Sequence, residues 1–398
     1  MLGYSEPYIL LMTFFALISA FQIFVKVDNT IQNICVFVID ATLILFLGFR
    51  GYILTDWAII YKDLYTTMPP LYKIAETWHY ITESTLDPLF LAYTSICKCF
   101  SGEYQFFVLI NFLTDLILIH IVFNRYLDKK YWAFFIIIYL GFNGLIFEGN
   151  LMRNTKSLLL FLLSLKYIQE RKFCKFLILN IIGLGFHWTS LLLLPTYFLL
   201  HIRISMKTFV IITLSTVVLF FITPYLVELL GKPIATIIGG DVLDKYNAYS
   251  TDEVYRRSKG FGLGDIQRYT IAMIILIFYN ILKKDKRSTA FINAFCIHLL
   301  IATIGSDFEI ILDRLSALFL FSIWFIFPIL LDNLNNIRNK LIIFAIFTLL
   351  PMAKLYKTLR HDPFVNYDNV LIGKHKTYEE RLEFYNENYQ KLLQGEFK

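Results

Sequence analysis

Ionisable residues near the ends of long apolar runs are the first candidates for chemistry in this sequence. They are Arg50, Glu148, Arg153, Lys156, His187, Arg268, Asp307, Glu309, Asp313 and Arg314. A charge at membrane depth costs about 2.5–3.5 kcal/mol on insertion scales, so such a residue usually faces a polar cavity or has a charged partner. Most of these residues belong to different runs but would lie at the same depth, near the outer ends of the predicted helices. We therefore expect them to converge on one outward-facing cavity, with buried structural ion pairs as the alternative.

His187 stands in a polar, glycine-containing break, Gly183-Leu-Gly185-Phe-His187-Trp188-Thr189-Ser190. An imidazole below the membrane surface can act as a base or bind an anion when it is protonated. The simpler interpretation is that it hydrogen-bonds a carbonyl that the break sets free. Both interpretations remain open from the sequence.

Two long polar stretches bring further candidates. The first contains aromatic residues among carboxylates, suited to stacking on sugars or to the headgroup region: Trp57, Tyr61, Tyr65, Tyr72, Trp78 and Tyr80. The second contains Arg256-Arg257-Ser-Lys259, followed by Gly260-Phe-Gly262-Leu-Gly264 directly before an apolar run. A glycine-rich turn at a helix N-terminus can present backbone N–H groups to a phosphate. Glycines that merely end a loop are the alternative.

The elements that position these residues are membrane helices. Of 398 residues, 57% are hydrophobic and 17% are charged, and the mean hydropathy is +0.59. Unbroken apolar runs long enough to span the hydrocarbon core, which takes about 20 helical residues, indicate helices and exclude a barrel. The net charge is +6, and the Lys and Arg residues cluster beside the apolar runs. This placement indicates membrane topology, and we expect no nucleic-acid partner. The five cysteines include a Cys97-x-Cys99 pair with no nearby histidine, and we expect neither a metal site nor a cofactor.

Basic short loops set the predicted orientation. The loops 125–130, 171–175, 203–207, 283–287 and 338–340 can all be cytoplasmic if Leu89–Phe100 is interfacial or re-entrant and if the break at His187 makes a broken-helix hairpin. This predicts an all-α, polytopic membrane protein with about 12 membrane helices and both termini outside. Residues 1–358 form the membrane domain, with extracytoplasmic loops at about 50–103 and 229–265.

Residues 359–398 are polar and predict a separate C-terminal tail. Thr377 and Glu380 are spaced as a capping box. An apolar stripe then follows at helical spacing: Tyr378, Leu382, Tyr385, Tyr389 and Leu392. We expect an amphipathic helix that lies on the membrane or on the outer loops.

Short motifs over roughly residues 1–330 resemble the EpsG/Wzy-type polysaccharide polymerases. They are Gly48-Phe-Arg50-Gly51, Thr55-Asp56-Trp57 with Tyr61, Asp87-Pro88-Leu-Phe90, Arg153 before an apolar helix, Phe186-His187-x-x-Ser190 and Arg314-Leu315. The sequence departs from the family pattern at two positions. Leu54 replaces a glycine before Thr55-Asp56, and Asp87 stands where glutamate is usual.

The resemblance implies a GT-C-like fold and a bacterial inner-membrane glycosyltransferase that joins undecaprenyl-pyrophosphate-linked oligosaccharides on the extracytoplasmic face. The growing glycan would pass from its lipid pyrophosphate to a sugar hydroxyl of the incoming unit, without a metal and with inversion. The candidate bases are Asp56, Glu148 and His187. Pyrophosphate or sugar would be bound by Arg50, Trp57, Tyr61, Asp87, Arg153, Arg256, Arg257, Arg268 and Arg314. A chain-length regulator is an additional candidate partner.

Two other classes share these features. A flippase or secondary transporter also has about twelve helices with buried charges, but transporters usually show two related halves, and no internal repeat is evident. An O-antigen ligase or membrane acyltransferase would use the same arginine and histidine chemistry with a different acceptor.

Overall fold

The computed structural model describes residues 3–226, Pro233, Thr236, 262–304, 315–372 and 375–393. The described residues form helices joined by turns, with no β-strand among them. The chain divides into two compact units, Met1–Tyr197 with Arg338–Lys398 (unit 1) and Phe198–Ile337 (unit 2). The all-helical part of the prediction is therefore confirmed.

Six helices in the described part are long and apolar enough to cross a membrane. They cover Gly3–Phe24, Asn29–Gly48, Tyr104–Tyr126, Lys129–Gly149, Leu315–Asn333 and Ile337–Leu359. Three shorter apolar helices cover Phe173–Phe186, Met206–Ile222 and Ser288–Thr303. The total of about twelve membrane helices and the sidedness of the loops remain predictions.

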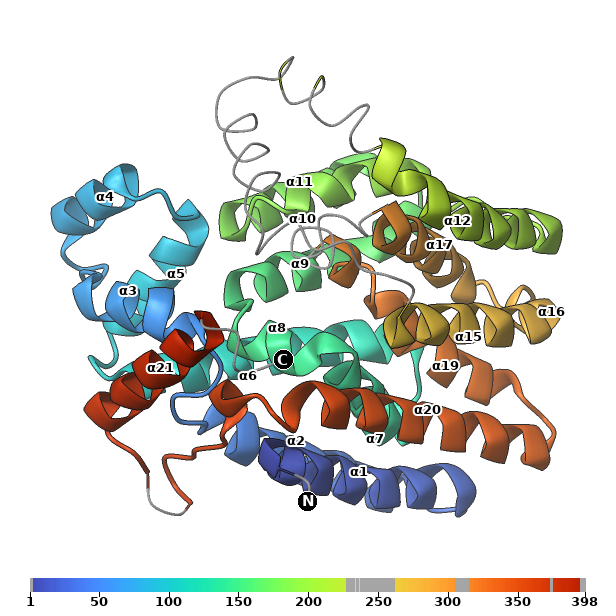
Figure 1. Cartoon of the computed structure of the whole chain (residues 1–398), viewed down its shortest axis with the longest axis horizontal. Helices are drawn as coiled ribbons and strands as arrows, with labels where there is room; N and C mark the ends of the chain where they lie inside the picture. The colour runs from blue at the N-terminus through green and yellow to red at the C-terminus, as the bar shows by residue number, and fades with distance from the viewer. Residues whose placement is uncertain are drawn as a thin grey trace. The chain divides into compact units, whose positions relative to one another are not determined.

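Unit 1 is built from long apolar helices and a group of short ones. In chain order it contains α1 (Glu6–Phe24), α2 (Asn29–Leu43), α3 (Lys62–Thr67), α4 (Ile74–Glu83), α5 (Pro88–Lys98), α6 (Tyr104–Tyr126), α7 (Trp132–Tyr139), α8 (Leu145–Gly149), α9 (Met152–Gln169), α10 (Phe173–Phe186), α11 (Ser190–Leu193), α20 (Ile337–Leu359) and α21 (Tyr378–Leu393). Figure 1 shows α3, α4, α5 and α21 together at the left-hand end of this unit.

The long helices of unit 1 run in alternating directions, and the two ends of the unit carry different residues. At one end the Tyr4 N–H donates to the Arg360 carbonyl, and the loops after α2 and before α9 meet. We call this the site end. At the opposite end the Lys129 ammonium donates to Asn33 Oδ1, 2.7 Å away. This basic end also carries Lys26, Arg125, Lys130, Arg171, Lys172 and Lys175. The loops after α2 and before α9 thus lie at one end of the helices, and the short loops with Lys and Arg lie at the other end.

The broken helix predicted around His187 is present as an interruption. α10 ends at Phe186, His187 has extended backbone, and α11 begins at Ser190. The Ser190 hydroxyl donates to the Asn180 carbonyl, so the chain folds back on α10. Gly183 is required there because a Cβ would meet the Ser190 hydroxyl. Whether both ends of this hairpin face one side of a membrane remains a prediction.

The C-terminal tail packs on the loop that follows α2. The capping box forms, since the Glu380 N–H donates to Thr377 Oγ1 and the Thr377 N–H donates to Glu380 Oε2. Tyr385 is buried, and Tyr378 and Leu382 pack beside it on an aromatic cluster. Tyr389 and Leu392, the other members of the predicted stripe, are exposed. Of the two predicted positions for this helix, the structure places it on the loops.

Unit 2 contains α12 (Met206–Leu226), α15 (Leu263–Ile277), α16 (Tyr279–Leu282), α17 (Ser288–Ile304) and α19 (Phe321–Asn333). α17 packs against α12 and α19, and Phe291 stacks on Phe325 with 4.7 Å between ring centroids. Arg287 pairs with Asp285 and Asp332.

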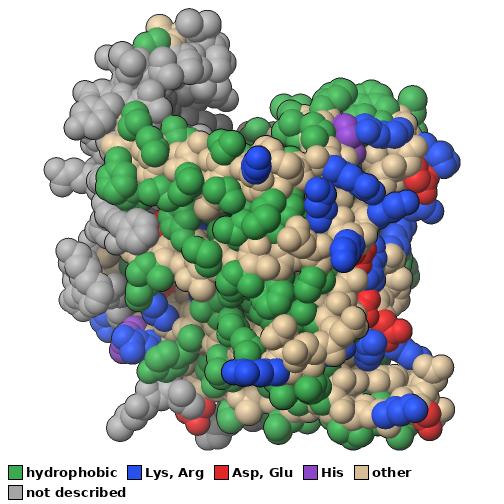
Figure 2. Space-filling view, turned by 90° about the vertical axis from the view of Figure 1, so that its right-hand side faces the viewer, with side chains coloured by type: hydrophobic (Ala, Val, Ile, Leu, Met, Phe, Trp, Pro, Cys, Tyr) green, Lys and Arg blue, Asp and Glu red, His purple; other side chains and the backbone are tan. Residues whose placement is uncertain are grey.

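Figure 2 shows one face of the molecule, where hydrophobic side chains cover broad areas and Lys and Arg side chains gather toward the right-hand edge. Such apolar surfaces are those expected of a protein that faces lipid.

Candidate functional site

The site end of unit 1 brings together the loop after α2, the start of α5, the start of α9 and the break after α10. The loop after α2 is held by Asn150, whose side-chain carbonyl accepts from the N–H groups of Thr55 and Asp56 at 3.0 and 3.1 Å. The Asn150 amide donates in turn to Thr55 Oγ1. Asp56 is half-buried at this point. Asn150 was not among the sequence candidates, because an asparagine between two helices carries no charge to single it out.

Arg153 occupies the first turn of α9. One terminal nitrogen of its guanidinium lies 2.7 Å from Asp87 Oδ2, and the two side chains are 17% and 12% exposed. Its buried Nε makes no hydrogen bond within the described residues. The N-terminus of α9 has no side-chain cap, so its backbone N–H groups add a positive dipole next to this cation.

Tyr61 links the two halves of this arrangement. Its hydroxyl donates to the Asn150 carbonyl at 2.8 Å and lies beside Arg153. Burial raises the pKa of Tyr61 to about 12, with a further rise from the nearby Asp56 carboxylate, so the phenol stays protonated as a donor. Asp56, Tyr61, Asn150, Arg153 and Asp87 therefore form one continuous polar group.

The break after α10 contributes its backbone to the same group. The N–H of Trp188 bonds the Asp87 carboxylate, and with Arg153 it opposes the effect of burial, which raises the pKa of Asp87. The His187 imidazole faces its own turn, since Nδ1 accepts from the Thr189 N–H at 3.2 Å. This bond joins the imidazole to a backbone N–H and not to a carbonyl set free by the break, so the role of His187 stays a prediction.

A second, deeper network lies beneath the first. The Arg50 guanidinium donates to the main-chain carbonyls of Leu47 and Glu148 at 2.8 and 2.6 Å, and Arg50 is only 3% exposed. The Glu148 side chain is fully buried and accepts from the Tyr139 hydroxyl. Arg50 and Glu148 thus join the loop after α2 to the end of α8, away from solvent.

Lys156 forms a buried ion pair with Asp115, 2.7 Å apart, with side chains 2% and 0% exposed. Asp115 was missing from the sequence candidates because it lies in the middle of the α6 run and not near its end. A carboxylate inside so long an apolar run is itself the signal that could have found it. Asp40, which bonds His120 and the Trp132 indole between α2, α6 and α7, was missed for the same reason.

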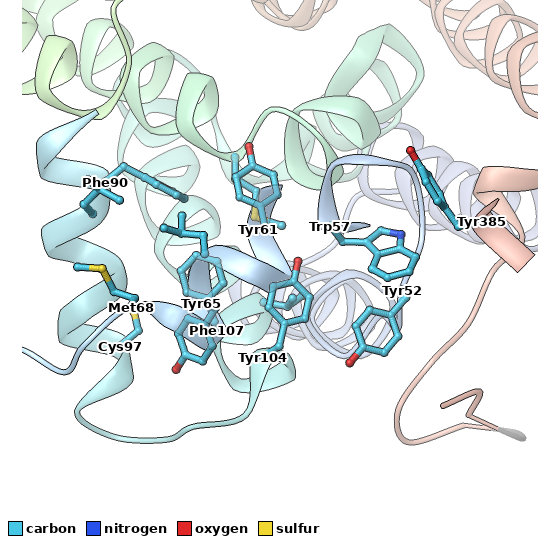
Figure 3. Close-up of a cluster of buried hydrophobic side chains, with 14 of the residues drawn as sticks. Tyr52, Trp57, Tyr61, Tyr65, Met68, Phe90, Cys97, Tyr104, Phe107 and Tyr385 are labelled. Carbon is cyan, nitrogen blue, oxygen red and sulfur yellow. The ribbon is translucent and has the colours of Figure 1, made fainter. Parts of the chain in front are cut away.

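The aromatic residues of the first loop divide into two sets. Trp57, Tyr61 and Tyr65 belong to a buried cluster with Tyr52, Tyr104, Phe107 and Tyr385 (Figure 3). Tyr80 is half-buried and packs against the same cluster. Tyr72, before α4, and Trp78, within it, are exposed. In this structure only the second set presents ring faces to the surroundings.

The remaining predicted site residues lie outside unit 1 or outside the described part. Arg268, in unit 2, pairs with Asp265, whose carboxylate also accepts from the Gly262 N–H. The N-terminus of α15 is thus already bonded to a carboxylate of its own first turn. Arg256, Arg257, Arg314, Asp307, Glu309 and Asp313 lie outside the described residues. Of the predicted set, the structure brings together Asp56, Tyr61, Asp87 and Arg153, with Arg50, Glu148 and Lys156 buried beneath.

Comparison with known proteins adds one finding. The profile of the EpsG family matches residues 33–369, which include every element of this polar group. Neither a curated protein nor a solved structure matches the chain. Because the match covers most of the sequence, the chain belongs to the EpsG family, a family of polysaccharide polymerase-like membrane proteins.

Proposed function

We propose that this protein polymerises undecaprenyl-pyrophosphate-linked oligosaccharide repeat units on the extracytoplasmic face of the bacterial inner membrane. The observation that carries the proposal is that Asn150 accepts from the Asp56 backbone N–H and from the Tyr61 hydroxyl, which lies beside Arg153. A residue with a carboxylate and a residue with a cation thus flank one hydrogen-bonded bridge. A glycosyl transfer from a pyrophosphate donor needs both groups: a base for the acceptor and a positive charge for the leaving group.

In this mechanism Arg153 binds the lipid pyrophosphate. The guanidinium sits at the uncapped N-terminus of α9, where helix dipole and cation act on an anion together. Asp87 orients the guanidinium through one nitrogen and leaves other N–H groups for phosphate oxygens. Removing one such stabilising donor typically costs about 10²–10³ in rate.

Asp56 is the proposed base. It removes the proton from a sugar hydroxyl of the incoming unit, whose oxygen forms the new bond to the anomeric carbon of the growing glycan. The bond from that carbon to the pyrophosphate oxygen breaks, and the lipid pyrophosphate leaves with the electron pair. Glu148, fully buried beneath the loop, and His187, bonded to its own turn, fit positioning roles better.

The extracytoplasmic location is supported by the separation of the two ends of unit 1. Short loops rich in Lys and Arg remain on the cytoplasmic side. The basic end carries such loops, and the proposed reacting groups lie at the other end. A pyrophosphate headgroup at the outer membrane surface would meet Arg153 at this level.

The test is polymerisation by purified protein in liposomes that contain the lipid-linked repeat unit. Arg153→Ala is expected to abolish polymer while membrane insertion stays normal. Arg360→Ala is the matched control, because Arg360 is exposed at the same end and lies outside the polar group. Full-length polymer from Arg153→Ala would reject the proposal, and so would wild-type protein that moves single units across the bilayer without joining them, as a flippase does.

A further inference from the structure

The C-terminal residues 362–372 and 375–393 contact the loop that carries Asp56 through backbone and side-chain bonds. The Gly51 N–H donates to the Asp368 carbonyl at 2.8 Å, and the Val370 N–H donates to the Phe49 carbonyl at 2.9 Å. These bonds form a short antiparallel bridge between Arg50 and Asn369. Farther along, the Leu54 N–H donates to the Phe364 carbonyl at 2.7 Å. The tail therefore supplies backbone partners to both ends of the Arg50–Leu54 stretch.

Side chains of the tail also fix the end of the helix before this loop. The Asn369 amide donates to the Leu45 carbonyl at 2.7 Å, and the Tyr367 hydroxyl donates to the Phe46 carbonyl at 3.0 Å. Tyr367 and Phe46 stack with 4.1 Å between ring centroids. The carbonyls of Leu45 and Phe46 belong to the last, widened turn of this helix, where the regular ladder of hydrogen bonds is altered.

Asp368 connects this backbone grip to α21. Its Oδ2 lies 3.0 Å from His375 Nδ1 and 3.5 Å from Arg381 Nε, and both Asp368 and Arg381 are nearly fully buried. A Cβ on Gly51 would overlap the same carboxylate, so glycine is required for the close approach. A buried carboxylate held by an arginine and a histidine fixes geometry strongly, because removing the Arg381 cation leaves an uncompensated buried charge.

α21 then covers the far side of the loop. Tyr378 and Tyr385 pack edge-on against Trp57, with centroids 6.2 and 6.0 Å away, and Figure 3 shows Tyr385 approaching Trp57 from α21. Burial raises the pKa of Tyr385, and the Asp56 carboxylate adds to this rise, which places Asp56 near the phenol. Asn150 holds the same loop from the other side.

We infer that Asp368 is a positioning residue for Asp56, acting through the Gly51 backbone and through the Arg381 pair that seats α21 on Trp57. The inference rests on the proposed function only in the role given to Asp56. It adds a segment that the family match leaves out, since the match ends at residue 369 and α21 follows it. The tail is thus a working part of the site and not an appendage.

The experiment compares the wild type with Asp368→Asn, Arg381→Ala and the exposed control Glu383→Gln. Hydrogen–deuterium exchange reports the loop directly, because the Gly51 and Leu54 amides bond the tail. We expect exchange in the 49–57 peptide to become about tenfold faster in Asp368→Asn and in Arg381→Ala. We expect no change in the 129–149 peptide of these variants, and none in either peptide of Glu383→Gln. In the polymerisation assay we expect kcat to fall about tenfold while KM for the lipid-linked unit stays constant, because the Arg153 group is untouched.

The two readouts test the positioning role of Asp368 and the proposed polymerase function separately. Unchanged exchange and kcat in Asp368→Asn, measured beside an active wild type, would overturn the positioning role. A wild type that binds the lipid-linked unit but never joins two would overturn the polymerase proposal, and exchange would still decide whether Asp368 holds the loop. If Asp368→Asn lowers the yield of folded protein, Arg381→Lys answers the same question. Lysine keeps the charge but lacks the Nε that lies 3.5 Å from Asp368 Oδ2. Shifts in both readouts that are smaller than those of Arg381→Ala support the role, and unchanged readouts overturn it.

Discussion

Leu54 has a backbone conformation that favours glycine, the residue that the resemblance to the EpsG/Wzy-type polymerases leads us to expect there. Its φ of 67° lies in the left-handed region, which suits the glycine expected there and costs a leucine about 1–2 kcal/mol. The leucine side chain is nevertheless buried, 4% exposed, against Gly149. Burial of a leucine contributes about 1.5–3 kcal/mol, enough to offset the strain. The positions 54 and 149 therefore form a matched pair of a large and a small residue.

The pair predicts opposite effects of single and double substitutions on stability. Gly149→Ala alone should destabilise strongly, because its Cβ would overlap Leu54 Cδ1. Leu54→Gly alone should also destabilise, since the lost side chain and the cavity outweigh the relieved backbone strain. The double variant should recover most of the loss, measured as the midpoint of thermal unfolding in detergent. Additive losses in the double variant would contradict this pairing.

Asp87 and Arg153 predict a pH dependence of stability. Burial raises the pKa of Asp87 and Arg153 lowers it, so Arg153→Ala should raise this pKa further. A carboxyl whose folded pKa is raised contributes stability below its unfolded pKa of about 4 and loses that contribution as pH rises through the folded value. Arg153→Ala should therefore lose stability more steeply than wild type as pH rises from about 4 toward neutrality.

The double variant Arg153→Ala with Asp87→Asn separates the effect of Arg153 on stability from its effect on polymerisation. It removes the buried, unpaired carboxylate, so the steep pH dependence should vanish and the unfolding midpoint at neutral pH should recover. Polymerisation should stay lost, because the cation for the leaving group is still missing. Recovery of activity together with stability would show that Arg153 only neutralises Asp87.

At the level of the elements, the span Lys129–Gly149 and α20 approach each other closely. The helix pair α7 and α8 is kinked between Leu140 and Gly144, where Phe142 and Asn143 leave the helical conformation. Gly141 in this kink contacts Pro351 of α20 so closely that a Cβ would clash with the proline ring and backbone. Small residues at such crossings let membrane helices pack through their backbones.

Gly141→Ala is therefore expected to separate α20 from the kink and to destabilise the protein by about 1–3 kcal/mol, as overpacking does. Gly102→Ala is the matched control, because a Cβ there would meet nothing within 4 Å. Thermal unfolding of the purified variants measures both. Equal midpoints for the two alanine variants would remove the close approach as a source of stability.

The sequence predicted elements best where one physical constraint dominates. Apolar length indicated the spanning helices, and the Thr377–Glu380 spacing predicted the cap of α21. Sequence spacing could not show that Trp57 would be buried beneath α21, because that contact joins residues more than three hundred positions apart. The candidate site was found through its charges, and Asn150, its uncharged centre, was not.

For the whole molecule, the distribution of charge between the two ends of unit 1 connects fold to orientation. The helices alternate, so every second connection returns to the same end. The connections at the basic end are short and carry Lys and Arg. At the site end, the connection from α2 to α6 is long and carries Asp56 and Asp87, whereas α8 and α9 are joined by Asn150 and Leu151 alone. Because short basic loops are retained in the cytoplasm, this arrangement predicts the side of the reaction without reference to any catalytic residue.

Two natural cysteines test that orientation. Cys99 follows α5 at the site end, Cys174 lies in the first turn of α10 at the basic end, and both are exposed. Two variants, each keeping one of these cysteines and carrying serine at the other cysteine positions, are treated with a membrane-impermeant maleimide. In intact cells the variant with Cys99 should be labelled, and the variant with Cys174 should be labelled only after permeabilisation. Labelling of Cys174 alone in intact cells would turn Asp56 and Arg153 toward the cytoplasm, and polymerisation on the outer face would then have no reacting groups.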